Sequence, residues 1–139
     1  MRPMESHAPP AHAAVTRTER RLIVLALLLG VFLTALDVLV VAPAMPSVVA
    51  DLNGLPLYPW VFSAYLLAAT VTTPIYGRLA DVHGRKRLYL VGLGLFLAGS
   101  ALSGAASSME MLVAMRGLQG LGAGALIPIT LTLVADLYP

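Results

Sequence analysis

The chain has 139 residues, of which 58% are hydrophobic and 12% carry a charge. A soluble globular domain carries a charge on about a quarter of its residues, so this composition predicts a membrane protein. Cysteine is absent, which excludes a disulfide framework and a thiolate metal site. The net charge of +2 is too small to indicate a nucleic acid as a partner.

Residues 1–21 are polar and irregular, with several prolines. Such a segment offers little apolar surface to bury, so we predict a disordered tail at the membrane surface. His7 and His12 lie in this tail beside prolines, and their spacing is poor for a metal site.

Four apolar runs follow the tail, and each is close to the ~20 residues that a helix needs to cross ~30 Å of hydrocarbon. They cover residues 22–46, 57–77, 88–107 and 109–135. Short connections join these runs into hairpins. The sequence therefore predicts an all-α membrane protein in which four transmembrane helices form one transmembrane domain over residues 22–139.

The first apolar run also has two features of a cleaved signal peptide. Arg20 and Arg21 form a basic flank, and the small residues of Ala42-Pro43-Ala44 resemble a cleavage site. The run is longer than the ~7–15 residues of a signal core, and it contains Asp37. We therefore interpret it as a transmembrane helix.

The basic residues gather before the first helix and between the second and third helices. These positions hold Arg2, Arg17, Arg20, Arg21, Arg78, Arg85, Lys86 and Arg87. The other two connections carry Asp51 and Glu110 and no basic residue. Because basic connections stay in the cytoplasm, we predict a multi-pass protein of the inner cell membrane with a cytoplasmic N-terminal tail.

Two ionisable residues, Asp37 and Arg116, interrupt the apolar runs. Placing either one in hydrocarbon costs on the order of 2.5–3.5 kcal/mol on insertion scales, so each must face protein or water and is a candidate functional residue. The alternative is a structural ion pair, or a side chain that reaches to the membrane interface.

The depth of these two charges follows from helix geometry. At ~1.5 Å per residue, Asp37 lies about 22 Å beyond Leu22 on the way out. Arg116 lies about 8 Å beyond Met111 on the way in, so both charges fall in the outer half of the bilayer. If their helices line one cavity, the guanidinium and desolvation act in opposite directions on the protonation of Asp37. A carboxylate balanced in this way can exchange a proton for a cationic substrate.

The fourth run is rich in small residues on and near the face of Arg116. They are Gly117, Gly120, Gly122 and Gly124. Gln119 and Gly120 follow Arg116 by three and four residues, so they lie on its face of the helix. Glycines let a neighbouring helix or a substrate approach closely. The Gly120-x-x-x-Gly124 spacing also occurs in helix dimers, although ordinary packing is its commoner use. Pro128 in the same run is expected to kink the helix.

The connection GRLADVHGRKRL holds Asp81 and Arg85 four residues apart, so these two side chains can pair. Gly77 and Gly84 allow tight backbone turns, and Lys86 meets the cytoplasmic face. A pair of this kind can hold one conformation and release another.

Three motifs point to one family. Gly77-x-x-x-Asp81-x-x-Gly84-Arg85-Lys86 resembles the signature loop between helices 2 and 3 of the major facilitator superfamily. Arg116-x-x-Gln119-Gly120-x-Gly122 is similar to its helix 4 motif, and LDVLVVAPAMP resembles the helix 1 motif of its drug:proton antiporters, especially the fourteen-span branch. The chain departs from these patterns at Leu39, Ala42 and Val82, where Thr, Asn and a basic residue are usual.

The resemblance implies proton-coupled efflux of small, drug-like or cationic molecules by alternating access. It assigns Asp37, Arg116 and Gln119 to substrate and proton coupling, and the Asp81 and Arg85 region to a conformational latch. A proton gradient is the expected driving force, without a cofactor. The superfamily's members have two pseudo-symmetric halves, so we expect an N-terminal fragment whose partners are lipid, substrate, protons, and missing C-terminal helices or another chain.

Two other interpretations stay open. A four-span chain that dimerises is similar to the small multidrug resistance proteins, which also carry a membrane carboxylate in their first helix. Alternatively, Asp37 and Arg116 only hold helices together in a membrane protein that does not transport. We do not expect an enzyme, because the sequence offers no Ser/His/Asp set, carboxylate pair, phosphate loop or metal cluster.

Overall fold

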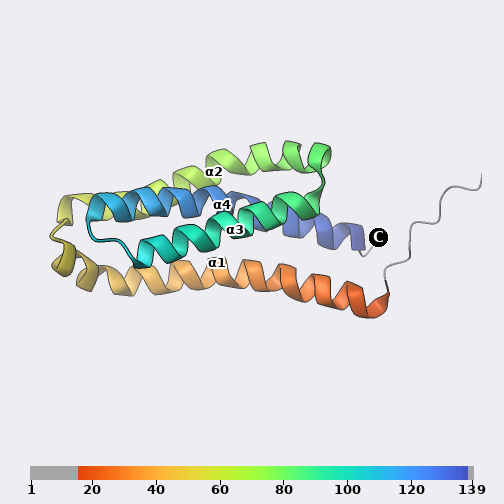
Figure 1. Ribbon diagram of the computed structural model, residues 1–139, viewed down its shortest axis with the longest axis horizontal. Helices are drawn as coiled ribbons and strands as arrows, with labels where there is room; N and C mark the ends of the chain where they lie inside the picture. The colour runs from red at the N-terminus through yellow and green to blue at the C-terminus, as the bar shows by residue number, and fades with distance from the viewer. Residues whose placement is uncertain (1–15, 138–139) are drawn as a thin grey trace, which may run out of the picture.

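A computed structural model describes residues 16–137 as four long antiparallel helices (Figure 1). They are α1 (Arg17–Leu52), α2 (Tyr58–His83), α3 (Arg85–Gly104) and α4 (Met109–Leu137), with a short 3-10 helix η1 (Leu55–Leu57) before α2. Each of the four long helices is long and apolar enough to cross a membrane. The predicted all-α fold with four membrane-spanning helices is confirmed.

The first helix begins earlier than the sequence predicts. Thr16 Oγ1 accepts a hydrogen bond from the Glu19 backbone N–H at 3.3 Å, and Glu19 Oε2 accepts one from the Thr16 N–H at 2.9 Å. This capping box satisfies N–H groups that a helix start leaves free. The predicted disorder is therefore wrong for residues 17–21, whereas residues 1–15 of the predicted tail lie outside the described residues.

The first helix also ends later than expected, because Pro43 and Pro46 lie inside α1 and do not terminate it. The backbone angle of proline suits a helix, but proline inside one loses the hydrogen bond to the carbonyl four residues earlier, and its ring crowds that carbonyl. The predicted connection from residue 47 to Leu52 is therefore wrong. Asn53 ends the helix in the left-handed conformation, with φ of 49°, which Asn adopts more readily than most residues.

A single residue, Gly84, separates α2 from α3. Its φ of 91° lies in the region that favours glycine. The predicted connection over residues 77–88 is too long, because Gly77 and Asp81 lie inside α2 and Arg85 begins α3. Most residues of this segment are compatible with a helix, so the backbone turns only where glycine permits it.

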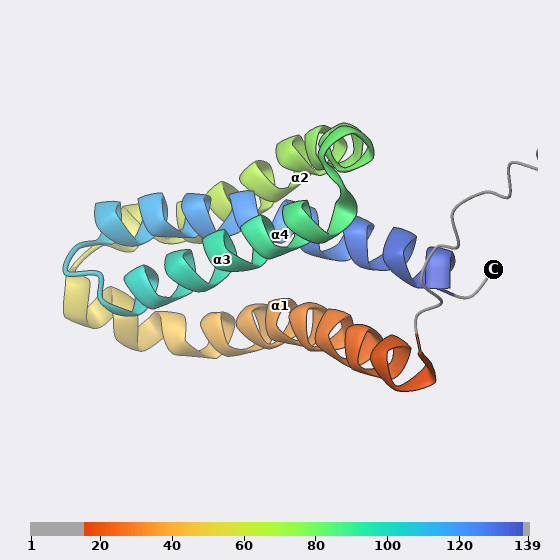
Figure 2. The ribbon, with the colours of Figure 1, turned by 45° about the vertical axis from the view of Figure 1, so that its right-hand side comes forward.

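α4 is the central helix of the bundle and packs against α1, α2 and α3. In Figures 1 and 2, α4 runs beside α3 while α1 follows the outside of the bundle. A Cβ atom on Gly120 would lie 2.3 Å from the backbone of α2, and one on Gly122 would lie 2.3 Å from the backbone of α3. A Cβ on Gly124 would lie 2.2 Å from the Thr72 hydroxyl of α2. These glycines therefore permit the close approach of three helices.

The fourth helix continues through Pro128. Proline has no N–H, so the Gly124 carbonyl lacks its usual donor within α4. Thr73 of α2 supplies a share of one, because its single O–H is divided between the Ala69 carbonyl of its own helix at 2.8 Å and Gly124 O at 3.2 Å. The contact between α2 and α4 therefore supports α4 where proline weakens it.

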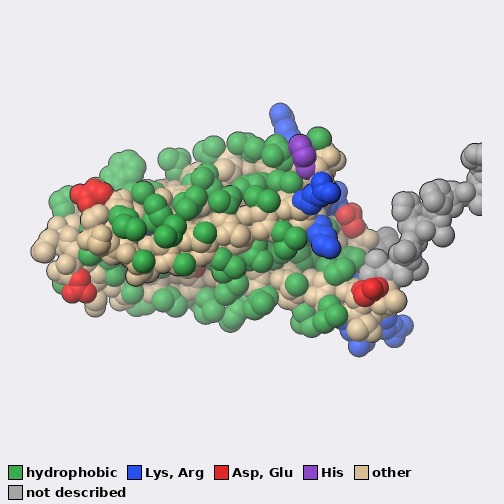
Figure 3. Space-filling model, in the orientation of Figure 1, with side chains coloured by type: hydrophobic (Ala, Val, Ile, Leu, Met, Phe, Trp, Pro, Cys, Tyr) green, Lys and Arg blue, Asp and Glu red, His purple; other side chains and the backbone are tan. Residues whose placement is uncertain are grey.

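Charged side chains gather at the two ends of the bundle (Figure 3). On the face shown, Lys and Arg lie at the end where α1 begins and α2 meets α3, which we call the basic end. The opposite end carries acidic side chains, and the surface between the two ends is largely apolar. This distribution is typical of a membrane-spanning bundle.

Candidate functional site

Two apolar clusters fill the interior of the bundle, and a polar site lies between them. The cluster nearer the basic end includes Leu126, and the other includes Leu112. Arg116 and Gln119 lie between these two positions on α4. Asp37 reaches the same level from α1, so the site is enclosed by apolar packing toward both ends.

Asp37, Arg116 and Gln119 form a closed ring of hydrogen bonds. Arg116 Nη1 donates to Asp37 Oδ2 at 2.6 Å and to Gln119 Oε1 at 2.9 Å. Gln119 Nε2 donates to Asp37 Oδ1 at 2.7 Å. The structure thus brings together all three residues that the sequence nominates for substrate and proton coupling.

Arg116 has two further neighbours, and both come from α2. Its Nε donates to the Val61 carbonyl at 3.5 Å, and its Cζ lies 4.4 Å from the centre of the Tyr65 ring. A ring face at this distance attracts a guanidinium, most strongly where water is excluded. Sequence reasoning missed both contacts, because a tyrosine in an apolar run is typical of ordinary packing.

The ring of hydrogen bonds makes a buried charge pair tolerable. The side chain of Arg116 is 3% exposed and that of Asp37 is 11% exposed. Charges at such depth persist only when they are paired and when their remaining donors and acceptors are satisfied. Gln119 meets this need, because its amide accepts from the guanidinium and donates to the carboxylate.

A cavity of about 400 Å³ lies between α1, α3 and α4 and reaches this ring. Asp37, Arg116 and Gln119 contribute its polar wall, and apolar side chains such as Met45 and Phe96 line much of the rest. The space is large enough for a small organic molecule. The carboxylate is therefore the negative group that a ligand in this cavity would meet.

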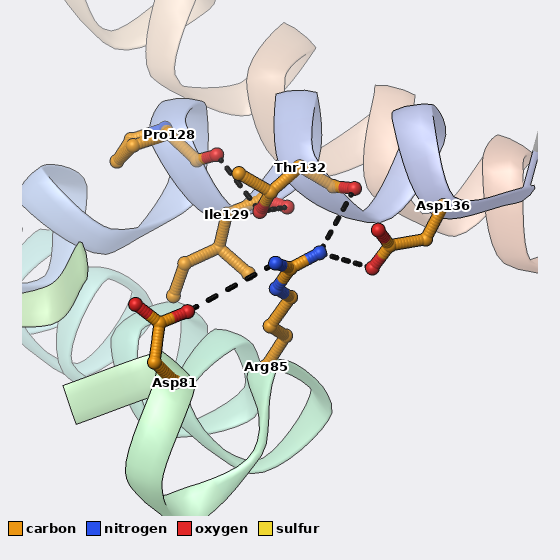
Figure 4. Close-up of polar contacts among 6 residues, drawn as sticks. All are labelled: Asp81, Arg85, Pro128, Ile129, Thr132 and Asp136. Atoms are coloured by element: carbon orange, nitrogen blue, oxygen red, sulfur yellow. Dashed lines mark hydrogen bonds and ion pairs between the residues drawn. The ribbon is translucent and has the colours of Figure 1, made fainter. Parts of the chain in front are cut away.

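A second charged cluster joins three helices at the basic end (Figure 4). Arg85 of α3 forms an ion pair with Asp136 of α4, and its Nη1 donates to the Thr132 carbonyl at 3.3 Å. Asp81 of α2 lies farther away, with Oδ1 3.9 Å from Arg85 Nη2. Arg85 thus contacts its expected partner only at long range. The sequence alone did not identify Asp136 as a partner of Arg85. The signal that the sequence offers for it is an acidic residue near the end of an apolar run.

The other residues of the predicted latch, Gly77, Gly84 and Lys86, take no part in this ion pair. Gly77 has no neighbour within 4 Å of the position of a Cβ. Lys86 is exposed and forms no ion pair within residues 16–137. Gly84 contributes the turn between α2 and α3. The geometry at this end therefore centres on Arg85.

Residues 27–139 match the profile of the Major Facilitator Superfamily. The chain belongs to this superfamily. It is 47% identical over 119 residues to Multidrug resistance protein 3 of Bacillus subtilis, a match that covers 86% of this chain and 23% of that protein. It is 43% identical over 122 residues to Multidrug transporter protein MdtP of Bacillus subtilis, covering 88% of this chain and 23% of that protein.

A fungal relative shows the same pattern. The chain is 41% identical over 117 residues to Efflux pump dotC of Dothistroma septosporum, covering 84% of this chain and 20% of that protein. The matched part of the chain thus covers less than a quarter of the length of each of these three relatives. Superfamily membership, together with four helices long and apolar enough to cross a membrane, identifies a multi-pass membrane protein.

Proposed function

We propose that this chain takes part in proton-coupled efflux of small, drug-like or cationic molecules by alternating access, as part of a longer polypeptide. The names of the relatives, a multidrug resistance protein and an efflux pump among them, support efflux. The proposed location is the inner cell membrane, with the basic end in the cytoplasm, because basic residues favour that side. The driving force in this proposal is the proton gradient, and no cofactor takes part.

The observation that carries the proposal is the place of Asp37 at the wall of a cavity, paired with Arg116 at 2.6 Å. A proton on the carboxylate removes its negative charge and weakens its attraction for the guanidinium. A cationic substrate is held best by the ionised carboxylate. Proton and substrate therefore compete for one group, which is the exchange that antiport requires.

The ion pair at the basic end fits the latch of this proposal. Arg85 ties α3 to α4 through Asp136 and the Thr132 carbonyl. Because Asp136 and Asp81 are largely exposed, water can compete for this pair when the helices separate. The contact can therefore form in one conformation and open in another.

The test of this proposal is Asp37→Asn in the chain at its natural length. Asn keeps the size of the side chain and can still accept from Arg116, but it is always neutral, so it carries no negative charge and cannot bind and release a proton. We expect at least a tenfold loss of ethidium efflux driven by a pH gradient in inside-out membrane vesicles, because proton and cation no longer share a charged group.

Asp51→Asn is the matched control, since it removes an exposed carboxylate near the end of the same helix. Vesicles with this variant should transport at the wild-type rate. Proton-driven efflux that survives Asp37→Asn at the level of this control would contradict the proposal.

A further inference from the structure

Tyr89 of α3 reaches across the bundle to α1. Its hydroxyl shares one hydrogen bond between the carbonyls of Ala26 and Leu27, at 3.2 Å and 3.3 Å. The residue is 6% exposed, so water does not compete for this contact. Hydrogen bonds in which one donor is shared by two carbonyls are a common arrangement in proteins.

Gly30 makes room for the tyrosine hydroxyl. A Cβ atom at this position would lie 2.0 Å from Tyr89 Oη and 3.1 Å from Tyr89 Cζ. Any larger residue would push the ring away from α1. The contact therefore depends on a tyrosine on one helix and a glycine on the other, and the sequence motifs include neither residue.

Tyr89 lies one turn after Arg85 on α3, so both side chains leave the helix on the same side. Arg85 binds α4 through Asp136 and Thr132, whereas Tyr89 binds α1. One turn of α3 thus holds the two helices that carry Asp37 and Arg116. Movement of this turn would act on both members of the buried charge pair.

The position of Tyr89 relative to the cavity supports a role in the same movement. On α1 and α3 the cavity lining begins at Leu33 and Phe96 and continues away from the basic end. Tyr89 and Gly30 lie on the basic side of these two positions. Their contact therefore bridges α1 and α3 between the cavity and the basic end.

We infer that Tyr89 is a positioning residue that couples the Arg85–Asp136 ion pair to α1, and through α1 to Asp37. When Arg85 holds α4, the tyrosine hydroxyl keeps α1 in place; when the ion pair opens, α1 follows α3. The role in transport rests on the proposed function, but the coupling is a property of the bundle and can be measured without transport.

The test follows the distance between α1 and α4 by spin-label spectroscopy, in the natural-length chain reconstituted in phospholipid vesicles. These 139 residues hold no cysteine, so Leu22→Cys and Leu131→Cys give two defined label sites once any cysteine elsewhere in the natural-length chain is replaced by serine. Both leucines are exposed, at 62% and 67%. Asp136→Asn then opens the ion pair, and we expect it to change the ratio of the short and long distance populations about three- to tenfold.

Tyr89→Phe removes the hydroxyl and keeps the ring. We expect Asp136→Asn to have no further effect in this background, because α1 no longer follows α3. Tyr76→Phe is the matched control, since the Tyr76 hydroxyl has no hydrogen bond within the described part of the chain, and the response should persist there. Gly30→Ala should also abolish the response, because a methyl group at this position of α1 displaces the Tyr89 hydroxyl.

Two results would overturn the coupling. One is an Asp136→Asn response that is equally large with Tyr89→Phe, which is what a merely structural tyrosine predicts. The other is the absence of any response when Tyr89 is present. Failure of the proposed function can be distinguished from failure of the coupling. In that case proton-driven efflux does not depend on Asp37, whereas the distance response to Asp136→Asn stays intact.

Discussion

At the scale of single residues, Arg116 shows why a guanidinium rather than an ammonium occupies the centre of the bundle. It donates to Asp37, Gln119 and the Val61 carbonyl, and it lies over the Tyr65 ring. A lysine offers a point charge, whereas the planar fork of arginine serves several acceptors at once and stacks on an aromatic face. The fork therefore fixes the geometry of the carboxylate that it neutralises.

This arrangement predicts unequal costs for removing one charge or both. Arg116→Gln leaves the Asp37 carboxylate buried without a cation, which costs about 3–5 kcal/mol. In Asp37→Asn/Arg116→Gln no charge remains, so we expect most of the lost stability to return. Thermal unfolding of the purified natural-length protein measures both variants. A double variant as unstable as Arg116→Gln alone would show that the unpaired charge of Asp37 is not the cause of the lost stability.

At the scale of helices, the interface between α2 and α4 repairs a defect in α4. Thr73→Val removes the hydroxyl that donates to the Gly124 carbonyl at 3.2 Å, and we expect a loss of about 0.6 kcal/mol, the usual value for such bonds between membrane helices. Pro128→Ala supplies an N–H to that carbonyl within α4, so Thr73→Val should cost less in this background, where only the hydrogen bond to the Ala69 carbonyl is lost.

The test compares the unfolding free energies of four proteins: the wild type, Thr73→Val, Pro128→Ala and the double variant. Thr34→Val is the matched control, because within the described residues its hydroxyl donates to the Val31 carbonyl of its own helix and to no carbonyl of α4. Its effect should be the same with and without Pro128. Equal costs of Thr73→Val in both backgrounds would refute the repair.

The same scale shows what the sequence can and cannot predict. Long apolar runs predict the four helices because crossing a membrane requires them. Helix ends depend on local caps that hydropathy does not reveal, such as the capping box at Thr16 and the left-handed Asn53. Asp37 and Arg116 stand out because charge is costly in an apolar run. Tyr65 and Asp136 gain their roles only from neighbours that the fold brings close.

At the scale of the whole molecule, the charges divide the bundle along its length. The basic end carries the α2–α3 turn, and the opposite end carries the α1–α2 and α3–α4 connections (Figures 1 and 3). The buried ring of Asp37, Arg116 and Gln119 pairs one positive with one negative charge. Orientation in the membrane is therefore governed by the exposed ends rather than by the interior site.

The orientation can be tested with two exposed apolar residues at opposite ends of the bundle. Leu55 is 70% exposed between α1 and α2, and Val82 is 79% exposed beside the α2–α3 turn. Replacing either one by cysteine changes no charge, and these 139 residues hold no other cysteine; any cysteine elsewhere in the natural-length chain is first replaced by serine. Because basic segments stay in the cytoplasm, a membrane-impermeant maleimide should label Leu55→Cys in intact cells and Val82→Cys only after permeabilisation. Labelling of Val82→Cys in intact cells would reverse the proposed orientation, and it would place the Arg85–Asp136 ion pair on the outer side of the membrane.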